Sequence, residues 1–144
     1  MVVSGCLDMF KEILEKTAKK VMLMLSFFVF YVYGFLWTLK PRRVETMSEL
    51  LDFFYYRFLR LKKEHVEVVK LTEHELVTIS RNPCPILRLA LFLELDTRYV
   101  CKLVSEPVCR YVLKRLNPSL VFERNYDYIR PYKDGCMERI YLRP

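Results

Sequence analysis

The side chains best suited to chemistry are four cysteines in the second half of the chain, Cys84, Cys101, Cys109 and Cys136, spaced C-x16-C-x7-C-x26-C. Thiols act as nucleophiles, redox groups or metal ligands, and they also serve as small buried hydrophobic side chains. A zinc ribbon would show C-x2-C pairs, and this spacing has none. The pattern leaves four interpretations open: core packing, a metal ion or iron–sulfur cluster bound by these cysteines, a catalytic or redox thiol, and a disulfide.

Helix geometry limits any metal site that uses all four cysteines. Cys101 and Cys109 fall in one predicted helix, eight residues apart, which corresponds to about 12 Å of rise along a regular helix. Zinc binds thiolates at about 2.3 Å, so one ion cannot reach both unless Pro107 breaks the helix sharply. A site of Cys84, Cys136 and one helical cysteine is easier to build.

Cys84 is the candidate nucleophile. It lies in Asn82-Pro83-Cys84-Pro85, after a predicted strand and before a predicted helix. A thiol near a helix N-terminus ionises more readily, and the neighbouring Arg81 and Arg88 would add to this effect. The chain has 2 histidines, and both belong to the first predicted hairpin, so a Cys–His pair could form only through that hairpin.

Arg124 is the candidate anchor for an anion. It alternates with Leu120, Phe122 and Tyr126 on one face of a predicted strand. If that face is buried, the guanidinium needs a partner, because a buried unpaired charge is costly. Two kinds of partner are open: an internal carboxylate, for instance Glu94 or Glu106, or a ligand carboxylate held bidentately.

The periodicity predicts an α+β fold within a single domain over 1–144, with a helical half over 1–63 and a cysteine-containing half over 64–144. We expect an antiparallel sheet of about four strands packed against helices, with a long apolar N-terminal helix. Asp96 is a candidate N-cap, and Pro107 should kink or divide the helix that contains it. The expected helices are 7–37, 47–63, 86–95 and 98–116, and the expected strands are 65–71, 75–81, 120–129 and 136–142.

Val21 to Leu39 carries no charged residue and has basic residues on both flanks. Its length is close to the minimum for a membrane span. However, Tyr31 and Tyr33 lie in its middle, and helical periodicity continues backward to Leu7. The favoured interpretation is one long helix whose second half is buried in the core or in a homodimer interface, and the alternative is membrane association through 21–39.

Composition narrows the class of protein. The net charge is +7 and hydrophobic residues make up 53% of the chain, which argues against disorder and favours a thermophilic, archaeal-type protein with a basic surface. No phosphate-binding glycine loop and no nucleic-acid-binding motif is present, so nucleic acid is an unlikely partner. The N-terminus does not resemble a signal peptide, which predicts a cytoplasmic protein with reduced thiols.

The second half of the chain also resembles a known family. The residues that carry this likeness are Cys84-Pro85, Val100-Cys101, Cys109, Leu116-Asn117-Pro118, Arg124 and Gly135-Cys136. Over roughly residues 82–142 they resemble L-2-amino-thiazoline-4-carboxylate hydrolase-like proteins and the related small-molecule-binding domains named after 4-vinyl reductase. The resemblance implies an α+β ligand-binding fold with cysteines near a pocket, and ring opening of a cyclic thiazoline carboxylate by water as the namesake activity.

The leading expectation is therefore a cytoplasmic small-molecule-binding domain, with a hydrolase of a cyclic amino-acid-like carboxylate as its catalytic form. Cys84 would be the nucleophile, and Arg124, Tyr126 and Asn117 would bind the substrate. The ligand could be anionic or hydrophobic. The alternatives are a metal or iron–sulfur sensor without catalysis, and a membrane-associated or structural protein that uses the apolar helix.

Overall fold

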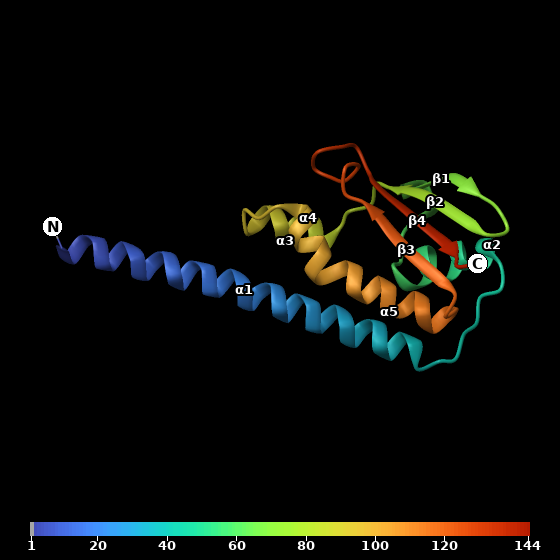
Figure 1. Ribbon diagram of the computed structural model, residues 1–144, viewed down its shortest axis with the longest axis horizontal. Helices are drawn as coiled ribbons and strands as arrows, with labels where there is room; N and C mark the ends of the chain where they lie inside the picture. Colours follow the sequence, from blue (N-terminus) through green and yellow to red (C-terminus); the bar gives the residue numbers. More distant parts are fainter. Residues whose placement is uncertain (1) are drawn as a thin grey trace.

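The protein is built in layers, which the structure, a computed structural model, describes for residues 2–144 with side chains from Leu7 onward. A four-stranded antiparallel sheet packs against helices, and a long helix lies on the far side of those helices (Figure 1). This arrangement confirms the α+β class and the long apolar N-terminal helix. The elements in chain order are α1 (Val2–Thr38), α2 (Met47–Leu50), η1 (Leu51–Phe58), η2 (Lys63–His65), β1 (Val66–Leu71), β2 (Glu75–Ser80), α3 (Pro85–Phe92), α4 (Thr97–Val100), η3 (Cys101–Ser105), α5 (Glu106–Leu116), β3 (Leu120–Asn125) and β4 (Cys136–Leu142).

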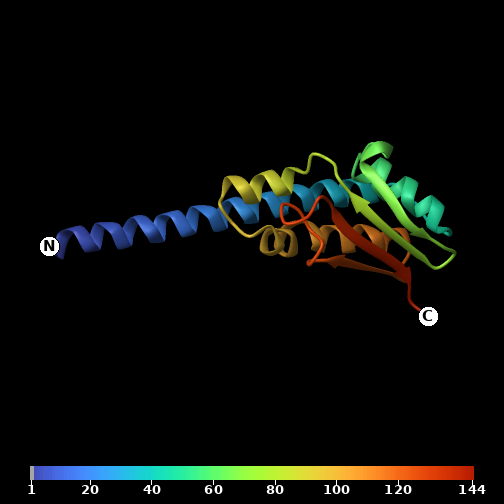
Figure 2. The same cartoon turned by 90° about the horizontal axis from the view of Figure 1, so that it is seen from above.

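The helix α1 packs on the body along only one of its faces. Its C-terminal half lies against η3 and α5, while its N-terminal half extends beyond the body (Figures 1 and 2). Gly34 allows the close approach, because a Cβ placed there would lie 3.0 Å from the Val108 side chain and 3.2 Å from that of Val112. Within the single chain, the second half of this helix is buried along one face alone, and the face opposite Gly34 is exposed. The alternative of a homodimer interface stays a prediction.

By length and composition, α1 could cross a membrane. The segment Leu7–Thr38 has a mean hydropathy of 1.9 in its most apolar window, of which 17% is buried. In this structure the apolar half contacts protein on one side through Leu23, Phe30 and Trp37.

The second helix begins as the sequence predicts and ends early. Thr46 caps α2, accepting a hydrogen bond from the Glu49 amide at 3.1 Å, and the Glu49 carboxylate accepts from the Thr46 amide in return, which is a capping box. The wider π-helical turn η1 follows and ends at Phe58. Arg60 then adopts a left-handed backbone with φ 53°, a conformation in which glycine is favoured after a helix.

The helical run from α4 to α5 shows how the chain accommodates Pro107. Asp96 caps α4, accepting from the Arg98 amide at 2.7 Å. The helix widens to a π-helix in η3, directly before α5, where Pro107 occupies the first turn. Proline has no backbone N–H to donate, and in this position the widened turn offers no α-helical acceptor for one, so no hydrogen bond is lost. The predicted division therefore takes the form of a change of helix type.

The sheet has the strand order β1-β2-β4-β3. Its inner face passes from apolar to polar along the strands. Leu76, Ile140 and Phe122 form one cross-strand row, and Thr78, Glu138 and Arg124 form the next. The expected strand over 120–129 stops at Asn125, and the chain then makes a long connection back to Cys136. The core lies where the apolar rows meet Phe54, Tyr55 and Phe58 of η1, together with α5.

Candidate functional site

A cavity of about 320 Å³ lies at the polar end of the sheet's inner face. Its walls come from α1, the end of η1, the start of α3, the η3–α5 helix and strands β2 to β4. The apolar part of the wall comprises Phe30, Tyr33, Phe58, Leu59, Leu61, Pro85, Ile86 and Ile129. This volume is at the lower end of the range for small-molecule sites in proteins.

All four predicted cysteines line this cavity. Cys84 is the residue that precedes the first turn of α3, and Cys136 begins β4; both are half-buried. Cys101 and Cys109 are buried on the η3–α5 helix. Both helical cysteines thus face the same cavity. The expectation from helix geometry was a different one, that the two could not bind one ion.

The cysteines as placed do not fit a metal centre. Among residues with described side chains, no group of three or more His, Cys, Asp and Glu residues is arranged to hold a metal ion. The same four cysteines are free thiols. The four described cysteines therefore form no site for a metal ion or an iron–sulfur cluster, and the fifth cysteine, Cys6, lies outside the described side chains.

Burial keeps the two helical thiols protonated. Desolvation raises the pKa of Cys101 to about 11 and that of Cys109 to about 12, and the nearby Arg124 guanidinium opposes both shifts. A thiol with such a pKa is neutral at pH 7 and is a poor nucleophile and a poor metal ligand. These two cysteines thus act as apolar wall of the cavity.

Arg124 is buried and held by internal partners. Its side chain is 8% exposed, and its Nη2 lies 2.6 Å from Oε1 of Glu138, whose side chain is 7% exposed. Its Nε also donates to that oxygen at 3.1 Å, and its Nη1 donates to the Ser105 hydroxyl at 2.7 Å. Neither Glu94 nor Glu106 is the partner, so that expectation is corrected to Glu138, which directly opposes Arg124 across β3 and β4.

The ion pair continues into a buried network that sequence reasoning missed. The Tyr55 hydroxyl donates to Oε2 of Glu138 at 3.0 Å and accepts from the Thr78 hydroxyl at 2.8 Å. Burial, followed by the Glu138 charge, raises the pKa of Tyr55 well above its usual value. The antiparallel register of the last hairpin would have signalled Glu138, whereas Tyr55 comes from a distant helix and carries no local signal.

Arg130 is a cavity cation whose described partners are all neutral. It follows Ile129 in the connection between β3 and β4, and its Nε donates to Sγ of Cys136 at 3.4 Å. Its Nη1 and Nη2 donate to the backbone and side-chain oxygens of Asn82. Within residues 7–144, Arg130 forms no ion pair, and the same holds for Arg60, which also lines the cavity.

Two predicted binding residues lie elsewhere. Asn117 ends α5, where its side chain donates to the Val44 carbonyl at 3.2 Å and accepts from the Ser119 amide at 2.9 Å. Tyr126 donates to the Glu106 carboxylate. Neither residue lines the cavity, so the structure gives both of them structural contacts. His65 and His74 do not line it either, and Cys84 has no histidine beside it there.

Comparison of the chain with protein-family models, with curated proteins and with solved structures gives no match.

Proposed function

We propose that this chain is a small-molecule-binding domain whose cavity takes a ligand with an apolar body and one anionic group. The observation that carries the proposal is the guanidinium of Arg130, which has only neutral partners in the wall of a largely apolar cavity. A guanidinium has five N–H donors, so Arg130 keeps donors for a ligand oxygen. Apolar walls with a few directed polar groups are typical of ligand sites.

The anion end of the site is proposed at Arg130, with Arg60 as a second cation at the cavity. Arg124, the residue first expected to hold a carboxylate, already neutralises Glu138. Its role in this proposal is to keep the polar end of the sheet rigid, since its donors are spent on Glu138 and Ser105.

The proposal favours binding over catalysis. The one carboxylate among the lining residues, Glu138, is bound by Arg124 and Tyr55, so it is not free to take a proton from Cys84. Hydrolysis of a cyclic amino-acid-like carboxylate remains the second candidate, because Cys84 lines the cavity at the N-terminus of α3. Turnover of a thiazoline carboxylate that is lost in Cys84→Ala would establish that candidate.

Calorimetric titration with octanoate and octanol tests the binding proposal, because these ligands share a chain length and differ in charge. We expect octanoate to bind at least tenfold more tightly than octanol, since a charge-assisted hydrogen bond contributes about 1.5 to 3 kcal/mol. Arg130→Gln should remove this difference. The matched control is Arg88→Gln, which removes an equal charge from the exposed side of α3 and should preserve the preference. Equal binding of both ligands to the unmodified protein would refute the proposed anion site.

A further inference from the structure

An exposed apolar stripe runs along α1 from Leu7 to Phe35 and continues to Leu39 just beyond it. It includes a heptad series at positions 7, 14, 21, 28 and 35, and the exposed fractions of its large side chains range from 43% to 63%. A second series, at 25, 32 and 39, runs beside the first. The large exposed members are Leu7, Phe10, Leu14, Val21, Leu25, Phe28, Phe35, Leu36 and Leu39.

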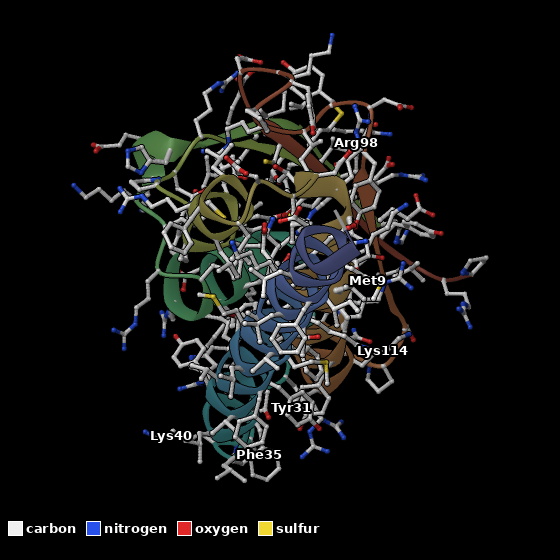
Figure 3. The ribbon with its side chains drawn as sticks, turned by 90° about the vertical axis from the view of Figure 1, so that its left-hand side faces the viewer. Met9, Tyr31, Phe35, Lys40, Arg98 and Lys114 are labelled. Atoms are coloured by element: carbon white, nitrogen blue, oxygen red, sulfur yellow. The ribbon has the colours of Figure 1, made fainter. Side chains whose placement is uncertain are left out.

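The stripe lies opposite the face of α1 that packs on the body. At about 100° per residue, Val21 and Phe28 are turned about 140 to 160° away from Leu23, which is 5% exposed. Figure 3 looks toward the projecting end of α1 and shows Phe35, a residue of the stripe, at the lower edge, away from the sheet. Other described parts of the chain leave this stripe uncovered.

The projecting half of α1 is amphipathic, with mixed charge on its polar face. That face carries Lys16 paired with Glu12 and Lys19 paired with Glu15, both at 2.7 Å. Helices that lie on anionic membranes instead carry a predominantly basic polar face. A mixed polar face beside an apolar stripe of heptad spacing is typical of helices that pair with helices.

We propose that this stripe packs against the same stripe of a second copy of the chain, with the two α1 helices antiparallel. A two-fold axis near Leu23 would place Leu7 opposite Leu39 and Leu14 opposite Val32. The projecting half of each copy would then lie along the body half of the other. This pairing leaves no part of the stripe in water.

Charge favours the antiparallel direction. The stripe ends in a basic segment, Lys40-Pro41-Arg42-Arg43, whereas residues 7–20 hold four lysines, two glutamates and one aspartate, a net charge of +1. Antiparallel packing in this register brings the start of the partner's basic segment next to the first residues of this nearly neutral segment, which include Asp8. Parallel packing would place the two basic segments together, where like charges repel.

The apolar area is sufficient for a stable pair. Nine large side chains, each exposing roughly 100 Å², present on the order of 900 Å² per copy. A standard protein–protein interface buries about 800 Å² per partner. The stripe therefore matches an interface of ordinary size.

The test is the mass of the full chain in solution by light scattering after size exclusion. Two copies of 17.5 kDa give a dimer of about 35 kDa, and we expect Leu14→Glu to convert it to a monomer. Leu14 projects beyond the body, so its substitution leaves the packing of each chain intact. Lys16→Glu, on the opposite face of the same turn, is the control and should remain dimeric.

Disulfide trapping reads the direction. In Leu14→Cys/Val32→Cys, peptide mapping by mass spectrometry should find a link between positions 14 and 32 of two copies. A link between positions 14 and 14 would overturn the antiparallel arrangement. A monomeric unmodified chain at 100 µM would overturn the proposal. If that monomer also sediments with phosphatidylserine vesicles, the stripe is a membrane contact instead.

Discussion

The buried ion pair between Arg124 and Glu138 should be among the largest single contributions to stability that a polar substitution can remove. Both side chains are less than a tenth exposed, and Glu138 is the only carboxylate on Arg124 among residues 7–144. Glu138→Gln preserves the shape of the side chain and removes its charge. The Arg124 guanidinium then remains buried without an opposite charge.

The expected loss is about 3 kcal/mol in the free energy of unfolding. Removing one partner of a buried ion pair costs about 3 to 5 kcal/mol, and the lower value applies here because both groups border the cavity, where water can reach them. With a urea dependence of about 2 kcal/mol per molar, the unfolding midpoint should fall by about 1.5 M. Urea titration followed by circular dichroism measures this shift.

The control is Glu123→Gln, on the exposed face of the neighbouring strand β3, where Glu123 pairs with Arg139 at 3.3 Å. That substitution should leave the midpoint close to that of the unmodified protein. If Glu138→Gln does not fold, Arg124→Met/Glu138→Leu should recover folding, because replacing both charges avoids the unpaired guanidinium. A loss below about 1 kcal/mol in Glu138→Gln would refute the argument that the Arg124 charge depends on Glu138.

Three further predictions concern other parts of the cavity. The pKa of Cys101 is about 11 in the folded state against 9.0 for an ordinary thiol. The unfolded state therefore ionises first, and the free energy of unfolding should fall between pH 9 and 11, by about 2 to 3 kcal/mol for this group. The fall should be smaller in Cys101→Ala, and an equal fall in both proteins would contradict the assignment. Iodoacetamide at pH 8 should label the half-buried Cys84 and Cys136 before Cys101 and Cys109, as peptide mass spectrometry can show, and octanoate should slow this labelling if the cavity is its site. Arg60→Gly should raise stability by about 1 kcal/mol, because a left-handed backbone disfavours residues with a Cβ, while it weakens octanoate binding; unchanged binding would remove Arg60 from the site.

The fold could largely be predicted from local patterns. Asp96 and Pro107 mark the boundaries of their helices, and alternation around Phe122 marks a strand, because each of these signals acts within a few residues. The π-helical turns before Leu59 and Pro107 could not be predicted, since they depend on how the helices meet their neighbours.

The site was less accessible to sequence reasoning. The burial of Arg124 follows from its strand, but its partner depends on hairpin register, which sets Glu138 opposite it. Nearness in sequence to Arg124 predicts Asn117 and Tyr126 as binding residues, but their side chains make contacts elsewhere. No sequence pattern marks Arg130 as a binding residue. Its candidacy depends on having neutral partners in the cavity wall, and only the folded arrangement shows these.

Gly34 has a consequence that reaches both sides of α1. Its missing Cβ lets the helix seat between Val108 and Val112 at one rotational setting about its axis. At that setting Phe30 and Tyr33 close the cavity while Phe28 and Phe35 face outward. A bulky side chain at this position would force α1 to lift or turn. A substitution at this single residue would therefore change the shape of the ligand cavity and the orientation of the outer stripe together.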